Sequence, residues 1–292
     1  MKTSIPEAEL MSAGHLACQG CGATLAMRYA LKGLGPKTAL VVPACCWTIL
    51  AGQGDKSSVG VPVIHCAFAA AAAAATGVKA GLMARGDTET VVVAWAGDGG
   101  TIDIGLQALS GAADRNEDIL YVCYDNEAYM NTGIQRSGGT PRSAWTMTTP
   151  DGSERPKKDI DAIVRAHHIP YQATATPAYA EDMVRKFKKA REIKGFRFLH
   201  ILAPCPPGWK FGPEDTVRLS RLAVQTGLFP LYEVENGDFR LNVPVAKRRP
   251  VGEFLESQGR FRGLTPEAEA GIQAEVDERW RLLGQEAERG RR

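Results

Sequence analysis

An aspartate between glycines and an asparagine farther along the chain are the first residues whose types and positions suggest chemistry. Asp98 follows the apolar run ETVVVAWA, and Asn126 comes just after the apolar run ILYVCY. Carboxylate and amide oxygens suit Mg²⁺, which often shares its coordination shell with phosphate oxygens. Neighbouring glycines let the backbone approach a phosphate without a side-chain clash, and here these are Gly97, Gly99 and Gly100. These residues predict a site for magnesium and a diphosphate.

The elements around these residues can bring them together. We expect a strand at 89–96, a helix at 102–114 and a strand at 119–124, which is one right-handed crossover with both strand ends at one sheet edge. Ligands of open α/β sheets bind at that edge, and the start of the helix offers free N–H groups to an anion. A tight turn with a solvent-facing aspartate is the plainer interpretation. The separation of Gly99 from Asn126 by residues 100–125 favours the site.

Alternation of apolar strands with helices predicts an α/β fold with a mostly parallel sheet and helices on both faces. A long segment at 126–150, rich in Gly, Ser and Thr, is expected to be a functional loop. Residues from about 206 on are expected to pack over the core or a partner. The other expected strands are 38–43, 61–65 and, as the last, 198–203, and the other helices are 23–34, 67–84, 160–166, 178–194 and 266–289.

Cysteines form a second constellation. The chain has seven, an odd number, and in a reducing compartment they are unlikely to form disulfides. Cys18 and Cys21 form a CxxC pair, Cys46 follows the strand TALVVP, and Cys205 follows the last expected strand. Four thiolates from three segments suit a cubane iron–sulfur cluster or a tetrahedral zinc ion. An isolated CxxC with core cysteines elsewhere is the third interpretation.

Composition excludes several classes of protein. The chain has 292 residues, is 44% apolar and has a formal net charge of +2, so no strong field points to nucleic acid or an anionic membrane. No apolar run approaches the roughly 18 to 20 residues that span a bilayer. The N-terminus lacks the apolar core of a signal peptide, so we expect a cytoplasmic protein.

Five segments, in chain order, resemble the beta subunit of 2-oxoacid:ferredoxin oxidoreductases, with the pyruvate branch as the nearest. The likeness covers about residues 10–235. The segments are GHLACQGCGATLAMRYALKGLGP, VPACCW, GDGGTIDIG, NEAYMNTG and PCPPGW. The spacing of GDG and the asparagine also resembles the thiamine-diphosphate signature, in which the Asp, the Asn and a carbonyl two residues later hold magnesium. Here these are Asp98, Asn126 and Ala128, and Glu127 stands where the signature often has a second Asn.

The resemblance implies three cofactors and their ligands. Thiamine diphosphate and Mg²⁺ would bind at the GDG motif, and a [4Fe–4S] cluster would bind Cys18, Cys21, Cys46 and Cys205, with Cys45 as an alternative to Cys46. Asn131 would contact cofactor or substrate as a catalytic residue, and Thr132 would contact the diphosphate. Residues 1–235 would form the thiamine diphosphate-binding domain, and 236–292 a C-terminal tail and helix that contact another subunit.

The implied reaction is the oxidative decarboxylation of a 2-oxo acid, pyruvate as the first expectation, with coenzyme A. The products would be acyl-CoA, CO₂ and electrons that pass to the cluster and on to ferredoxin. The carboxylate that activates thiamine has no matching motif here, so the family's alpha subunit would supply this glutamate. A ferredoxin-like iron–sulfur subunit and a gamma subunit complete the expected complex. No nucleic-acid partner and no membrane span are expected.

Alternative functions remain open at this level. Within the family the substrate could be a branched-chain or aryl 2-oxo acid such as phenylglyoxylate, or oxalate, and the final acceptor could be NAD. Outside it, the chain could be a thiamine-dependent decarboxylase or synthase without redox chemistry, or a non-enzymatic subunit held by zinc. Bound iron distinguishes the first class from the other two.

Overall fold

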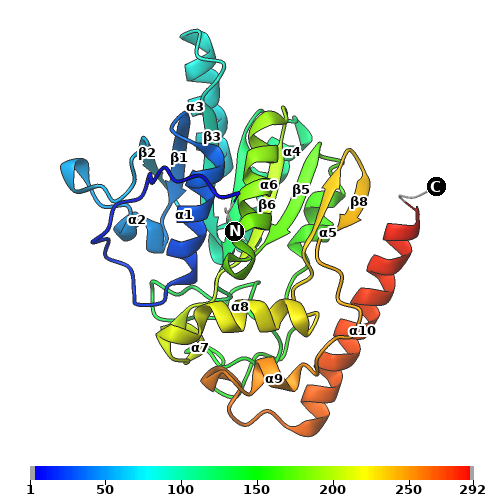
Figure 1. Cartoon of the computed structure of the whole chain (residues 1–292). Coiled ribbons are helices and arrows are strands. Elements are labelled where there is room, and N and C mark those ends of the chain that lie inside the picture. The colour runs from blue at the N-terminus through cyan, green and yellow to red at the C-terminus, as the bar shows by residue number, and fades with distance from the viewer. Residues whose placement is uncertain (1–3, 290–292) are drawn as a thin grey trace.

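A mostly parallel sheet forms the centre of the molecule, as the computed structural model shows (Figure 1). The structure describes residues 4–289, so residues 1–3 and 290–292 of the two expected domains lie outside it. The strand order is β2-β1-β3-β4-β6-β5-β7-β8. The first six strands are parallel to one another, β7 is antiparallel to β5, and β8 is antiparallel to β7. The strands are β1 (Thr38–Pro43), β2 (Val63–Cys66), β3 (Val91–Gly97), β4 (Leu120–Asp125), β5 (Tyr171–Ala175), β6 (Arg197–Leu202), β7 (Tyr232–Glu235) and β8 (Asp238–Leu241).

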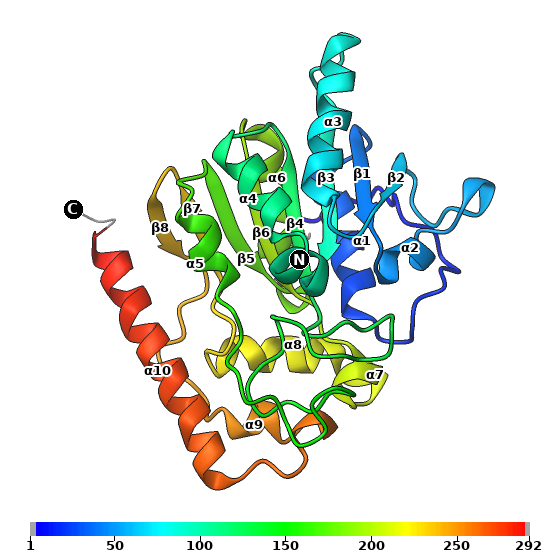
Figure 2. The same cartoon turned by 180° about the vertical axis from the view of Figure 1, so that it is seen from behind.

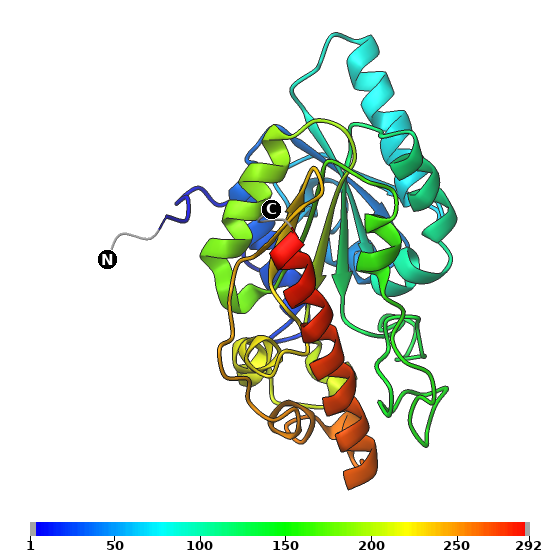
Figure 3. The same cartoon turned by 90° about the vertical axis from the view of Figure 1, so that its right-hand side faces the viewer.

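Helices cover both faces of the sheet, so the expected fold class is confirmed. Figure 3 shows the sheet nearly edge-on between two helical layers, and Figure 2 shows α3, α4 and α5 in front of it. The α-helices are α1 (Gly22–Leu34), α2 (Cys46–Leu50), α3 (Ala71–Ala84), α4 (Leu106–Asp114), α5 (Ile160–Arg165), α6 (Ala180–Glu192), α7 (Pro206–Trp209), α8 (Thr216–Gln225), α9 (Gly252–Leu255) and α10 (Pro266–Arg289).

Each face of the sheet has its own apolar core. The α1 and α6 side is built around Trp95, which is fully buried and packs against Trp47, Tyr124 and Phe187. On the other side the small residues of α3 approach β3 closely, since Ala75 is fully buried there. Such all-round burial explains the uninterrupted apolar runs of β3 and β4.

A third core lies beyond the edge at which the parallel strands end. Leu202, the last residue of β6, packs there with Trp209 and with residues of α8, α9 and α10. Figure 1 shows α7, α8 and α9 below the sheet and α10 along its side. The segment after residue 206 therefore packs on the core, as expected. Among residues 4–289, no helix combines the length and apolarity that crossing a membrane requires.

Several sequence expectations need correction. The expectation that the strand at 198–203 is the last was wrong, because the hairpin β7–β8 follows it, adds to the sheet and crosses the expected domain boundary at residue 235. Its turn residues Asn236 and Gly237 both have positive φ, 49° and 91°, and Asn-Gly is a strong hairpin signal that the expectation overlooked. Strand β5 and helix α8 were also not expected. The loop at 126–150 contains only isolated bridges and turns.

Candidate functional site

The edge at which β3 and β4 end carries the first group of expected site residues. These strands are parallel neighbours, with Gly97 opposite Tyr124. The residues that follow are Asp98, just beyond β3, and Asp125, the last residue of β4, so they lie side by side at this edge. Both carboxylates are buried, with 1% and 0% of their surfaces exposed. The crossover expected from the sequence thus brings two acidic groups together in one buried place.

Three oxygen-bearing groups expected to bind magnesium converge at this edge. One terminal atom of the Asn126 amide lies 2.9 Å from Asp98 Oδ1 and 2.9 Å from the carbonyl oxygen of Ala128. A nitrogen in that position donates two hydrogen bonds. The structure instead has the amide oxygen there, so three oxygens form one cluster, and oxygen is the donor that Mg²⁺ prefers. The residues present therefore fit a hard cation.

The electrostatics of Asp98 favour such a cation. Burial raises the pKa of Asp98 well above its ordinary value, and the neighbouring Asp125 raises it further, while a hydrogen bond donated by the Ser137 hydroxyl lowers it. Within residues 4–289, no basic side chain forms an ion pair with Asp98, whereas Asp125 pairs with Lys157. A charged buried carboxylate needs a partner, and a bound cation would be one.

A chain of buried charges extends from Asp125 away from Asp98. His200, in β6, has its Nε2 2.9 Å from Asp125 and its Nδ1 2.8 Å from Asp161. Burial alone would lower the pKa of His200, but Asp161 and Asp125 outweigh it and raise the pKa to about 9. Burial raises the pKa of Asp125, yet Lys157 and His200 hold it at about 2. The histidine is therefore a cation between two carboxylates at neutral pH.

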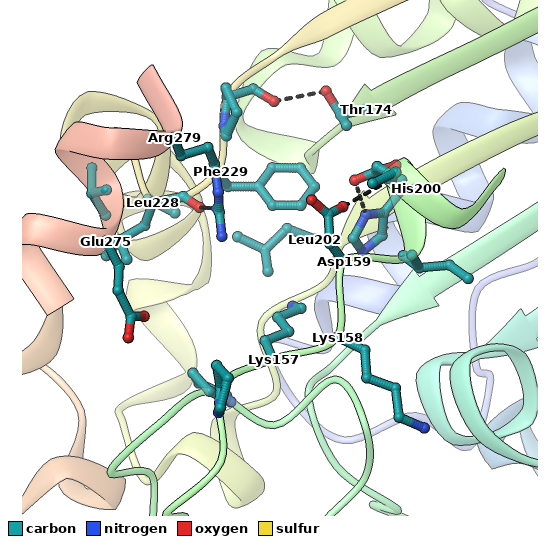
Figure 4. Close-up of a pocket in the computed structure, with 18 of the residues that line it drawn as sticks. Lys157, Lys158, Asp159, Thr174, His200, Leu202, Leu228, Phe229, Glu275 and Arg279 are labelled. Carbon is teal, nitrogen blue, oxygen red and sulfur yellow. Dashed lines mark hydrogen bonds and ion pairs between the residues drawn. The ribbon is translucent and has the colours of Figure 1, made fainter. Parts of the chain in front are cut away.

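This charged chain borders a cavity of about 350 Å³ between α10 and the sheet. Figure 4 shows Lys157, His200 and Phe229 around it, with Arg279 of α10 on the opposite side. None of these residues was expected from the sequence to belong to a site. A histidine inside the apolar strand FLHIL and the pair Lys157–Lys158 were the available signals.

The glycines of the GDG motif are packed against aromatic rings. A Cβ atom on Gly99 would lie 2.2 Å from the ring of Tyr129, and one on Gly100 would lie 3.0 Å from the ring of Phe68. The chain then forms a π-helical turn at Gly99–Asp103, a feature common at functional sites. The turn needs glycines because a side chain at these positions would clash with the two rings. The approach of these glycines to a phosphate stays a prediction.

Asn131 and Thr132 lie on the loop that follows Ala128. Both are exposed. The Thr132 hydroxyl donates to Gln135 Oε1 at 2.6 Å, and within the described residues no hydrogen bond joins Asn131 or Thr132 to the three converging groups. The structure therefore does not bring them into direct contact with the predicted metal ligands.

The four expected cluster cysteines form one neighbourhood. The loop of Cys18 and Cys21 docks on the segment that carries Cys205, since the N–H of Gly22 donates to the Pro204 carbonyl at 3.0 Å. Burial, followed by the repulsion of Cys45, Cys205, Cys21 and Cys18, raises the pKa of Cys46 to about 12. Such mutual repulsion would be relieved by iron or zinc bound to thiolates.

In the described part of the chain, no three His, Cys, Asp or Glu side chains are grouped closely enough to hold a single ion. Cys45, the alternative to Cys46, is engaged elsewhere. Its side chain accepts a hydrogen bond at the start of α2 and interacts with the hydroxyl of Tyr124. Cys18, Cys21, Cys46 and Cys205 are thiols, which iron and zinc accept as ligands, but the structure does not arrange three of them around one ion position, so the cluster stays a prediction.

The chain is similar to known proteins over most of its length. Residues 48–201 match the family described as thiamine pyrophosphate enzyme, C-terminal TPP binding domain. The chain is 50% identical to subunit VorB of the ketoisovalerate oxidoreductase of Pyrococcus horikoshii, over 98% of this chain and 96% of that protein. It is 51% identical to subunit PorB of the pyruvate synthase of Methanothermobacter marburgensis, over 94% and 96%.

A solved structure is similar as well. The 2-oxoglutarate:ferredoxin oxidoreductase of Magnetococcus marinus matches with a TM-score of 0.59 and 22% identity, over 75% of this chain and 84% of that chain. At this identity the likeness concerns the fold alone. It agrees with the sheet and the two helical layers described above.

His200→Gln should change the pH dependence of stability. The folded pKa of His200, about 9, lies above the unfolded value of about 6.5. Its contribution is therefore complete below pH 6.5 and is lost as pH rises through 9. Urea unfolding of the wild type should show that its free energy of unfolding falls by on the order of 2–3 kcal/mol between pH 6.5 and 9, at about 1.4 kcal/mol per pKa unit. The variant should not show this fall. Parallel slopes for both proteins would contradict this assignment.

Proposed function

The chain belongs to the beta subunits of the 2-oxoacid:ferredoxin oxidoreductases, and from this we propose that it binds magnesium and thiamine diphosphate at the ends of β3 and β4. With partner subunits it would catalyse the CoA-dependent oxidative decarboxylation of a 2-oxo acid. The observation that carries the proposal is the convergence of Asp98, Asn126 and the Ala128 carbonyl, with 2.9 Å between neighbouring atoms. These three groups would bind magnesium and, through it, the diphosphate.

The protein's own part in the reaction is to bind, orient and exclude water. When bound, thiamine diphosphate supplies a nucleophilic carbon and an electron sink for decarboxylation. Asp98 and Asn126 would hold the magnesium and the diphosphate, and both residues are buried from solvent. Tyr129 holds the following loop in place, because its hydroxyl donates to Asp103 Oδ2 at 2.8 Å. That loop presents Asn131 and Thr132, whose proposed contacts are substrate and cofactor.

Electrons would leave through a [4Fe–4S] cluster on Cys18, Cys21, Cys46 and Cys205. The mutual influence of the four thiols supports this assignment, and the engagement of Cys45 by the α2 start supports Cys46 as the third ligand. Arg260 lies near enough to Cys205 to lower the pKa of its thiol, although burial raises that pKa to about 12 overall. A thiamine site and a cluster in one chain would allow one-electron transfer after decarboxylation.

Substrate and partners are proposed from the family. The relatives compared are named for ketoisovalerate and for pyruvate at nearly equal identity, 50% and 51%, so we propose pyruvate or a branched-chain 2-oxo acid, with ferredoxin as acceptor. An alpha subunit would supply the activating glutamate, beside a ferredoxin-like subunit and a gamma subunit. The small exposed residues of α3, Ala73, Gly77 and Gly81, and segment 236–292 are the proposed subunit contacts.

Asp98→Asn should separate stability from cofactor binding. The variant removes a carboxylate whose pKa is raised by burial, so the cofactor-free complex should be at least as stable to heat as the wild type. Binding of Mg²⁺ with thiamine diphosphate should weaken by at least about 100-fold, more than for loss of an outer-shell contact. Equilibrium dialysis measures this, with Asp114→Asn on α4 as the exposed control. Undiminished binding by Asp98→Asn would refute the proposed magnesium site.

Iron analysis tests the cluster assignment. We expect the complex isolated without oxygen to contain about four iron atoms and four acid-labile sulfides for each copy of this chain. These are counted in addition to the iron and sulfide bound by the partner subunits. Cys205→Ser and Cys46→Ser should lose them, whereas Cys45→Ser should retain them. Loss with Cys45→Ser and retention with Cys46→Ser would reverse that assignment, and iron unchanged in all three would overturn the site.

A further inference from the structure

The turn that carries two of the three converging groups is held in a demanding conformation. Glu127 lies between Asn126 and Ala128 and has a φ of 68°. Residues with a side chain adopt this left-handed region at a cost of about 1–3 kcal/mol, and they keep it when surrounding contacts determine it. The conformation of Glu127 sets how the Asn126 amide and the Ala128 carbonyl face Asp98.

Every polar group of Glu127 has a partner. Its N–H donates to Asp125 Oδ1 at 3.0 Å, and its carbonyl accepts from the Thr140 hydroxyl at 2.7 Å. Its carboxylate accepts from Lys157 Nζ at 2.9 Å and from an Arg260 guanidinium nitrogen at 2.6 Å. The side chain is 9% exposed, so these contacts are made out of water, where charge-assisted hydrogen bonds are strong and directional.

Arg260 is fixed as firmly as its partner. It is 2% exposed, its guanidinium carbon lies 3.9 Å from the centre of the Trp209 ring, and its Nε donates to Gln258 Oε1 at 2.9 Å. The indole N–H of Trp209 in turn donates to the carbonyl of Asn126 at 2.7 Å. Arg260 thus contacts Glu127 directly and reaches Asn126 through the ring on which it stacks.

These contacts exceed what packing requires. A buried ion pair contributes little to net stability, because desolvation offsets the attraction, and an apolar pair of similar volume would serve as well. A directional pair does fix the geometry of the groups it holds. The residues it holds here are the neighbours of two proposed metal ligands, so its effect falls on the site rather than on the fold.

We propose that the Glu127–Arg260 ion pair positions the magnesium-binding turn, so that segment 236–292 completes the cofactor site in addition to any contact with other subunits. Both residues are positioning residues, since neither is a proposed ligand of the metal. The inference rests on the proposed function, because it assumes that the turn binds magnesium. It assigns a role to the residue that departs from the usual second Asn of the signature.

The test is a double-mutant cycle on the anaerobically purified complex. Wild type, Glu127→Gln, Arg260→Gln and the double variant are stripped with EDTA and titrated with Mg²⁺ at saturating thiamine diphosphate. Tryptophan fluorescence gives the dissociation constant of Mg²⁺. Each single variant should bind Mg²⁺ about 10- to 100-fold more weakly. The double variant should be no weaker than the weaker single variant, because residues that act as a pair are not additive.

Two further variants keep the result interpretable. Glu278→Gln breaks an exposed ion pair with Arg281 on α10 and should bind Mg²⁺ within about twofold of wild type. Arg260→Lys keeps the charge but not the forked geometry, and it should weaken binding less than Arg260→Gln. It also replaces Arg260→Gln if that variant does not assemble.

The outcomes separate the two proposals. Singles that bind Mg²⁺ like wild type, or a double variant whose loss is the product of the single losses, would overturn the positioning role while leaving the proposed function intact. A wild-type complex that binds neither Mg²⁺ nor thiamine diphosphate would instead refute the proposed function.

Discussion

A buried carboxylate without a basic partner in the described chain is the constraint on which the site depends. Asp98 is placed in an apolar edge by the parallel pairing of β3 with β4. The two other acidic groups at that edge are neutralised by Lys157, His200 and Arg260. Asp98 forms no ion pair within residues 4–289, and the amide and carbonyl beside it are oxygen donors of the kind that magnesium prefers.

Charge neutralisation also explains why distant segments meet at this edge. Lys157 comes from the segment that joins the long loop to α5, His200 from β6, and Arg260 from the segment beyond the β7–β8 hairpin. Each of them balances a carboxylate that would otherwise be charged without a partner. The same segment brings Arg260 near Cys205, so one guanidinium lies between the two proposed cofactor sites. Arg260 thus connects the turn at Glu127 with the surroundings of Cys205.

The sequence predicted those features that are local. The apolar runs of β3 and β4 are continuous because both faces are buried, and the glycine-flanked Asp98 and the asparagine mark their ends. The fold class, the order of the main elements and the grouping of Asp98 with Asn126 followed from this pattern, whereas Ala128 was added by the resemblance. The four cysteines were grouped by the resemblance, since their spacing alone left three interpretations open.

What could not be predicted depends on tertiary contacts or on short elements. Strand β5 reads YQATA and β7 reads YEVE, and four or five residues with polar alternation carry little signal. Arg260 is separated from Glu127 by more than a hundred positions, so no spacing rule connects them. A lone histidine in an apolar strand carries no signal of its own, and the two aspartates beside His200 are brought there by the fold.

The most direct measurement is a structure of the anaerobic complex with thiamine diphosphate and with Mn²⁺ in place of Mg²⁺, in which anomalous scattering locates manganese and iron. The account predicts a manganese peak within coordination distance of Asp98, Asn126 and the Ala128 carbonyl, and an iron peak among Cys18, Cys21, Cys46 and Cys205. Thiamine diphosphate bound with manganese away from those three oxygens would contradict it.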